Sequence, residues 1–370
     1  MKSILLTSTA LVAFAGAAAA EGHAESGITF GGEATLGYND AGDLGGGAAG
    51  DGFYWDANVA VTMTAVLDNG LTATATFDFD AVDGGTGIDL ESGGYVLSLS
   101  SDIASLSVGD LDPVAEDRWG GVDGSTVADF NDQDTHFDVA GFEAMLVGEA
   151  TVAGFTAAVS YGLDSGAGND LTGETLDAMQ IHVAGTFGDF GVELAYQEEF
   201  GPTPEIMGIG GSASFAGADI AVSYIDDGTE TSTGISASYP VGPVVIGGYY
   251  SMNDVAEDNY GLSADYDNGP ISVSAAWDVD GGEGGADDVA SFEVDASYDV
   301  GNGLTVLGGV FGTDVDGDDM GFYAAATYDL GGGAELLVSY ADDGDDAVLG
   351  EDLGGPEYKE GATIEASFAF

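Results

Sequence analysis

Carboxylates are by far the most abundant reactive side chains in this chain. Its 370 residues include 66 Asp and Glu but only three basic residues, Lys2, Arg118 and Lys359, which gives a formal charge of −63. Carboxylates without basic partners raise the local concentration of cations and lower that of anions. We exclude nucleic acid as a partner, because affinity for phosphate backbones comes chiefly from Lys and Arg.

The sequence offers few candidate catalytic residues. The histidines are His23, His136 and His182, and the chain has no cysteine. It contains no H-E-x-x-H, G-x-S-x-G or Walker motif. We therefore expect His182 to be a polar wall residue rather than a general base. The chain is predicted not to be an enzyme.

One acidic run has ligand types that suit calcium. Asp314, Asp316 and Asp318 bring carboxylate oxygens close together, as Ca²⁺ prefers. The run lacks the glycine at position six and the glutamate at position twelve of an EF-hand loop. We expect Ca²⁺ at these three residues as a candidate metal site, and the chain requires no cofactor.

An alternation of apolar and polar residues runs through the chain and predicts the elements that carry these carboxylates. In residues 71–79 every odd residue is apolar and every even one is polar, and residues 292–298 alternate in the same way. No helical window of comparable strength is found. The segments are about 8–11 residues long, which matches tilted strands that cross a bilayer.

The strands come in pairs joined by very short turns. Asn, Asp and Gly supply the positive φ angles that tight hairpins need. Longer Gly- and Asp-rich connections separate the pairs. The short turns lie at 68–70, 101–103, 152–154, 188–189, 216–218, 240–243, 267–269, 301–303 and 331–333. Nine hairpins plus the first and last segments give 20 strands, and 16 or 18 remain open because strand boundaries are uncertain.

Charge is confined to one parity of the alternation. The other parity carries Ala, Val, Leu, Ile, Phe, Tyr and Gly. The charged residues on the polar parity are Glu33, Asp78, Glu143, Glu149, Glu193, Glu293, Asp295 and Glu365. This pattern predicts an all-β antiparallel fold, either a soluble sandwich with a buried apolar face or a membrane barrel with an apolar outer face.

Three features favour the barrel: a secretory leader, the large number of strands, and tyrosines at strand ends, where an interfacial belt would lie. These tyrosines are Tyr161, Tyr196, Tyr224, Tyr266, Tyr298, Tyr328 and Tyr340. We expect one transmembrane antiparallel barrel domain of 16–20 strands over residues 21–370.

Residues 1–20 are typical of a secretory signal peptide. Lys2 precedes an apolar stretch from Ile4 to Ala15, and small residues Ala18 and Ala20 form an A-x-A cleavage site. The alternative, an amino-terminal membrane anchor, is disfavoured because the apolar stretch is short. The exported chain is predicted to begin near Glu21.

Three segments carry a resemblance to a known family. Residues 362–370 form an alternating strand that ends in Phe368, Ala369 and Phe370, which looks like the carboxy-terminal assembly signal of bacterial outer-membrane barrels. Residues 95–110 resemble the hairpin that leads into the constriction loop of general porins. Residues 32–38 are similar to the first strand of alphaproteobacterial porins. The chain thus resembles a general, non-specific bacterial outer-membrane porin.

The resemblance implies a homotrimer of water-filled barrels in the outer membrane of a Gram-negative bacterium, with outer-membrane lipid around it. It implies recognition of the last strand by the barrel-assembly machinery, and one loop folded into each lumen. Here that loop is expected at about 110–140, with pore-constriction residues Asp110, Asp112, Glu116, Asp117, Arg118, Asp123, Asp129, Asp132, Asp134, His136 and Asp138. The lumen wall is expected to carry Glu33, Asp78, Glu143, Glu193, Glu293 and Asp295.

Such porins usually place an arginine cluster opposite the acidic loop, and this chain lacks one. We therefore predict a water-filled channel for small hydrophilic solutes that prefers cations. The alternative is a secreted or surface-attached acidic β protein with a structural or adhesive role. A sugar-specific channel is disfavoured, because Trp119 and Tyr249 are the aromatic residues assigned to the lumen and are too few for a track.

Overall fold

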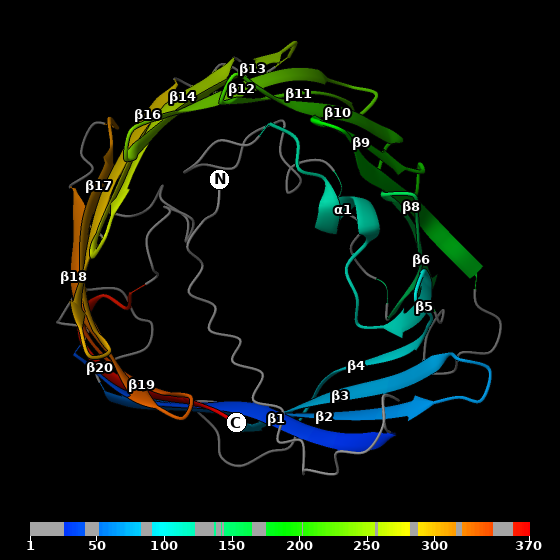
Figure 1. The fold of residues 1–370 in the computed structure, drawn as a ribbon, viewed down its shortest axis with the longest axis horizontal. Helices are drawn as coiled ribbons and strands as arrows, with labels where there is room; N and C mark the ends of the chain where they lie inside the picture. Colours follow the sequence, from blue (N-terminus) through cyan, green and yellow to red (C-terminus); the bar gives the residue numbers. More distant parts are fainter. Residues whose placement is uncertain are drawn as a thin grey trace.

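The computed structural model forms one closed ring of strands (Figure 1). It describes residues 26–40, 52–82, 91–122, 137, 142, 144–164, 175–201, 203–255, 258–281, 288–315, 320–342 and 358–370. The leader at 1–20 lies outside these residues. Within them, no helix is long and apolar enough to cross a membrane.

Twenty strands make up the ring, the number that the hairpin count gives. Their bounds are β1 Gly27–Asp40, β2 Gly52–Val66, β3 Thr72–Val82, β4 Glu91–Ser100, β5 Ala104–Gly109, β6 Ala144–Val152, β7 Phe155–Asp164, β8 Thr175–Phe187, β9 Phe190–Gln197, β10 Ile206–Phe215, β11 Ala218–Asp226, β12 Thr231–Val241, β13 Val244–Asn253, β14 Asn259–Asn268, β15 Ile271–Asp280, β16 Val289–Gly301, β17 Leu304–Thr313, β18 Gly321–Gly331, β19 Ala334–Asp342 and β20 Gly361–Ala369. A single short helix, α1, spans Val114–Arg118.

Each strand pairs antiparallel with the next along the chain, and β20 pairs with β1. The ring therefore has no free edge, which is what a β structure in lipid requires. All nine predicted short turns join the strand pairs in which they were expected. At two of them, Asn302 (φ 56°) precedes Gly303 (φ 83°) and Ala153 (φ 55°) precedes Gly154 (φ 87°), the positive angles of hairpin turns that match strand twist.

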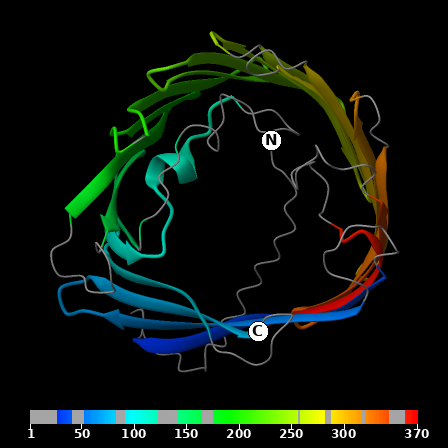
Figure 2. The ribbon, with the colours of Figure 1, turned by 180° about the vertical axis from the view of Figure 1, so that it is seen from behind.

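Register and α1 together identify the two faces of the ring. Both views place α1 inside it, against the strands drawn in green (Figures 1 and 2). The backbone of α1 is hydrogen-bonded to Ser160 and Gln180, so their parity faces the lumen. The alternate residues, such as Val159 and Ile181, face outward. Among the described strand residues, the charges of outward parity are Asp40, Asp226 and Asp342, all at strand ends.

The outer face has aromatic residues at both ends of the strands. The long-loop end carries Tyr38, Phe53, Trp55, Tyr161, Tyr196, Tyr224, Tyr250, Tyr260, Trp277, Phe322 and Tyr340, and the short-turn end carries Phe155, Phe187, Phe190, Phe215, Tyr239, Tyr266, Tyr298, Tyr328, Phe368 and Phe370. Within the first set Tyr250, Tyr260 and Trp277 contact one another with ring centroids 6.0 and 5.8 Å apart. All seven tyrosines expected at strand ends are outward. Two belts of amphipathic rings mark the two membrane interfaces.

This assignment of faces makes a prediction for adjacent residues of β11. Val222 lies at mid-strand on the outer face, and Ala221 faces the lumen. We expect Val222→Arg to lower the free energy of unfolding by about 2–4 kcal/mol, because it places a charge in hydrocarbon. Ala221→Arg places the same charge in water. Urea unfolding in lipid vesicles measures both variants, and an equal loss in Ala221→Arg would contradict the assignment.

Candidate pore constriction

The short helix α1 is fastened to the barrel wall by its backbone. The wall supplies the acceptors for the first N–H groups of α1, which has no side-chain cap of its own. Val114 N donates to Ser160 Oγ at 3.1 Å, and Ala115 N donates to Gln180 Oε1 at 2.7 Å. Gln180 is completely buried and its Nε2 donates to Gln197 Oε1 at 2.7 Å. This network fixes α1 on β7, β8 and β9.

Apolar packing holds the residue that follows α1. Trp119 is fully buried with its ring centroid 6.0 Å from that of Phe137. Gly208 of β10 leaves room for it, since a Cβ there would lie 2.9 Å from Trp119 Cη2. The wall beneath is apolar at Ala195, Ile206 and Ile225. Trp119 therefore lies on the inner side of the ring, as expected from the sequence, and is packed against the wall.

Arg118 is held between two carboxylates. Its Nη1 lies 2.6 Å from Glu149 Oε2 of β6, and its Nε lies 3.3 Å from Asp117 Oδ2. Both side chains of the shorter pair are about one-third exposed. The guanidinium thus links α1 to the wall and adds no free positive charge to the constriction.

Glu193 and His182 form a second fastening below α1. Glu193 Oε1 accepts a hydrogen bond from Gly120 N at 3.1 Å and lies 2.8 Å from His182 Nε2. His182 is 5% exposed. Both residues were predicted to be polar groups of the lumen wall, and the structure places them there, with a positioning role for the segment after α1.

The acidic residues of the constriction segment face the water. Asp110, Asp112 and Asp117 are exposed and Glu116 is half-buried. Asp110 lies against Gly94 of β4, where an added Cβ would come within 2.6 Å of its Oδ2. The remaining predicted constriction residues, Asp123, Asp129, Asp132, Asp134, His136 and Asp138, lie outside the described residues.

The inner wall is acidic well beyond the predicted positions. Register places Glu33, Asp78, Glu193, Glu293 and Asp295 on the lumen face as expected, while Glu143 lies outside the described residues. The same face also carries Glu365, which was on the polar parity of the sequence, and Asp56, Asp80, Asp219, Asp265, Asp278, Asp280, Asp299, Asp329 and Glu335, which were not assigned. The parity rule applied to every strand would have found them.

The lumen holds more aromatic residues than the sequence analysis assigned to it. Tyr54, Phe311 and Tyr323 have lumen parity, as Tyr249 does. The ring of Tyr323 lies 5.1 Å from that of Tyr358, which precedes β20. Burial, together with the nearby Glu335 and Asp295 carboxylates, raises the pKa of Tyr358 to about 12. Tyr54 could also have been assigned to the lumen from the alternation of residues 52–66.

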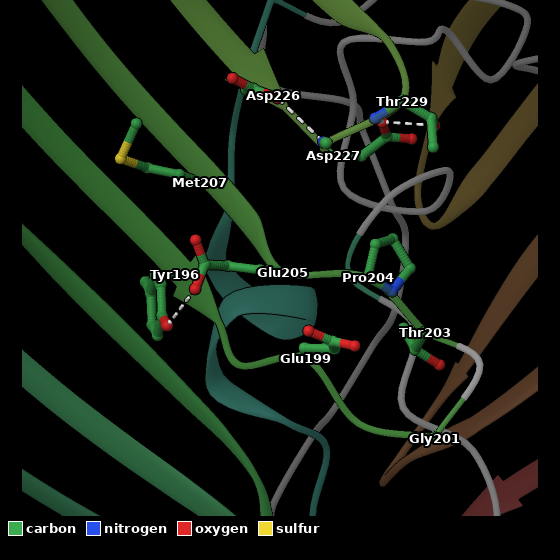
Figure 3. Close-up of a pocket in the computed structure, with 11 residues that line it drawn as sticks. Tyr196, Glu199, Gly201, Thr203, Pro204, Glu205, Met207, Asp226, Asp227 and Thr229 are labelled. Atoms are coloured by element: carbon green, nitrogen blue, oxygen red, sulfur yellow. Dashed lines mark hydrogen bonds between the residues drawn. The ribbon is translucent and has the colours of Figure 1, made fainter.

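A pocket of about 530 Å³ lies at the long-loop rim (Figure 3). It is lined by the connections after β9 and after β11, with Tyr196 and Met207 beside them. Its carboxylates bind groups of their own loops: Tyr196 Oη donates to Glu205 Oε2 at 3.0 Å, and Thr229 N and Oγ1 each donate to Asp227 Oδ1 at 2.7 Å. These acids stabilise loops.

The candidate calcium site is only partly described. Asp314 Oδ1 accepts a hydrogen bond from Ala290 N at 2.8 Å, and Asp316 and Asp318 lie outside the described residues. Among the residues that the structure describes, no group of three or more His, Asp or Glu side chains could hold a metal ion.

The last strand is fully integrated into the ring. Phe370 N donates to Gly32 O at 2.8 Å, so pairing with β1 continues to the final residue. Phe368 and Phe370 are 39% and 62% exposed on the outer face. Both residues predicted as the assembly signal therefore lie at the short-turn belt.

A family model described as Gram-negative porin matches residues 7–310 and 247–347, which is most of the chain. The chain belongs to the Gram-negative porin family. The similar solved structures include a refined porin structure at 18% identity with a TM-score of 0.45. They also include a triple mutant of Rhodopseudomonas blastica porin at 18% identity with a TM-score of 0.43. Each alignment covers 93% of this chain and all of the other. No curated protein matches.

Membership of this family indicates the role of the helix α1, which is held on the inner wall. This porin is an outer-membrane diffusion channel for small solutes, and α1 is the described part of a segment that enters its lumen. The resemblance seen in residues 95–110 is thus confirmed at the level of the family. That the porin has no enzymatic activity stays a prediction.

Gln180 provides a test of how α1 is held. We expect Gln180→Ala to loosen α1, because it leaves two buried N–H groups of the helix without an acceptor, at a cost of about 1–3 kcal/mol each. The open-channel current in planar bilayers should then fluctuate more and its mean should rise. Ser274→Ala, on the lumen face of β15 away from α1, is the control. Equal noise in both variants would show that Gln180 does not hold the helix.

Proposed function

We propose that this porin prefers cations and that the carboxylates on and around α1 are its selectivity filter. The observation that carries the proposal is the imbalance of charge on the inner surface. Carboxylates follow the lumen parity on both halves of the ring, whereas Arg118 is paired with Glu149 and Asp117. An acidic water-filled passage concentrates cations and excludes anions.

The narrowing segment is where this charge should act most strongly. Screening limits the reach of a charge in physiological salt to about 8 Å. Carboxylates on a wide wall therefore act only on the ions beside them. Asp112 and Asp117, which are exposed, and Glu116, which is half-buried, belong to the segment around α1, and α1 lies inside the ring (Figure 1).

The size of the effect is measurable with charge-neutral variants. We expect the triple variant Asp112→Asn, Glu116→Gln, Asp117→Asn to lower the K⁺/Cl⁻ permeability ratio by a factor of about three or more, because it removes three charges at the narrowing. The reversal potential of refolded protein in a KCl gradient measures this ratio. A matched triple variant at the short turns, Asp68→Asn, Asp102→Asn, Asp189→Asn, removes the same charge away from α1 and should leave the ratio nearly unchanged.

Two outcomes would contradict the proposal. A wild-type reversal potential on the anion side would remove the preference itself. Equal shifts in the two triple variants would mean that the total charge, and not the charge at α1, sets selectivity.

We further propose how the porin reaches its place and assembles. The leader is removed near Glu21, the last strand is recognised by the barrel-assembly machinery through Phe368 and Phe370, and the barrel forms a homotrimer. Support comes from the A-x-A motif and from the exposure of both phenylalanines at the belt. Gel migration of heated and unheated protein, with and without Phe370→Ala, tests the assembly step, since unassembled protein loses the heat-dependent shift.

A further inference from the structure

Three lumen tyrosines share one arrangement on the half of the ring away from α1. Each is paired in register with a glycine of the neighbouring strand, which is paired in turn with a carboxylate on the strand beyond. The sets are Tyr54, Gly37 and Glu365; Tyr323, Gly309 and Asp295; and Tyr249, Gly261 and Asp278. A Cβ at any of these glycines would collide with the tyrosine ring, so each ring lies flat across its glycine.

At Tyr54, which is half-buried, this arrangement presents an aromatic face to the lumen beside a carboxylate. One face of Tyr54 rests on β1 at Gly37, and its Oη donates to Glu365 Oε2. Tyr323 donates to Asp295 in the same way. A ring face carries partial negative charge, and a neighbouring carboxylate adds to it, so the surface suits a cation.

The chain places a cation of its own on one of these rings. The Nζ atom of Lys359 lies 4.7 Å from the centroid of the Tyr54 ring, within the range of a cation–π contact. Within the described part of the chain, no carboxylate oxygen lies within ion-pair distance of Lys359. Its ammonium group therefore lies on the aromatic face although acidic residues surround it on the wall.

The residues on either side of Lys359 hold it against the wall. The Tyr358 ring packs on Tyr323 with centroids 5.1 Å apart. The Glu360 carbonyl accepts a hydrogen bond from Asn39 Nδ2 at 2.8 Å. The segment 358–360 thus lies across two of the three tyrosine sets, and Lys359 is its exposed residue.

We propose that the lumen face of Tyr54 beside Glu365 is a binding subsite for organic ammonium ions, and that Lys359 is its tethered occupant. The inference deepens the proposed cation preference, on which it rests, by naming a class of solute. A free ammonium ion binds where the Lys359 head group lies, and the lysine competes with it at a high effective concentration. Removal of the Lys359 charge opens the subsite.

The test uses tetramethylammonium as the probe, with refolded full-length mature porin in planar bilayers. Lys359→Gln keeps most of the side-chain length and removes the charge. We expect the concentration of tetramethylammonium that halves the K⁺ current to fall about two- to five-fold, the size of an exposed cation–π contact. Lys359→Arg keeps a tethered cation and should retain the wild-type value.

Two double variants distinguish the contribution of the Tyr54 ring to the block from that of the lost Lys359 charge. Lys359→Gln combined with Tyr54→Leu has the same charge as Lys359→Gln alone but no ring, and the gain in block should vanish. Lys359→Gln combined with Tyr54→Phe keeps the ring and should retain the gain. Equal block in the leucine and phenylalanine variants would overturn the subsite. Block by glucose without block by tetramethylammonium would also overturn it, in favour of a sugar site.

The reversal potential of the same channels distinguishes a failure of the subsite from a failure of the proposed cation preference. Block that depends on the Tyr54 ring in a channel without cation preference would support the subsite and contradict the proposed cation preference. Block that does not depend on the ring in a cation-preferring channel would support the preference and contradict the subsite. For a variant that does not insert, saturation-transfer NMR of tetramethylammonium with the protein refolded in detergent reads binding directly, after heat-dependent gel migration has shown that the barrel is formed.

Discussion

The pairing of the first strand with the last governs this structure. In hydrocarbon every backbone N–H and C=O must find a partner within the protein. A sheet of 20 strands meets that demand only when β20 closes on β1, and here the pairing runs to Phe370, whose N–H bonds Gly32 O. Closure forces side chains to alternate between lipid and water along every strand. It also leaves the centre without a hydrophobic core, so anything inside the lumen must be fastened to the wall by specific contacts.

Because α1 must be held by specific contacts, the lumen-facing residues under α1 differ from those on the rest of the ring. Under α1, lumen positions hold the buried amide of Gln180 and the apolar residues Ile206 and Ile225, which match the free N–H groups and the Trp119 ring. A five-residue helix cannot cap its own first turn, and the strands supply its acceptors. On β13–β18 the same lumen parity carries carboxylates and tyrosines, of which Asp278, Glu293 and Tyr323 are buried against the wall. Alternation sets which residues face inward, and the tertiary contact with α1 sets which inward positions are apolar.

That distinction also explains how far the sequence could predict the structure. The strand number, the turns and the acidic lumen followed from period-two alternation, because lipid on one side and water on the other enforce it in each strand separately. The burial of Trp119 did not follow, because it depends on Gly208 and Ile225, which are 89 and 106 positions later in the numbering. The fastening of Glu193 to Gly120 and the link between Arg118 and Glu149 were missed for the same reason. Lumen aromatics such as Tyr54 were within reach of the alternation and were overlooked.

The two positive charges of the described chain are held in different ways, and the difference bears on the field inside the barrel. The planar guanidinium of Arg118 joins two carboxylates at once, as its fixed donors allow, and its charge is cancelled where the passage narrows. Lys359 is a compact, strongly hydrated charge on a flexible stem, and it lies on the Tyr54 face without a carboxylate at ion-pair distance among the described residues. An ion entering the lumen therefore meets an excess of carboxylates near α1 and an ammonium group on the wall beside β1 and β2. Because the arginine is neutralised by its neighbours and the lysine is not, substitution of Lys359 changes the field felt by solutes, whereas substitution of Arg118 first changes how α1 is held.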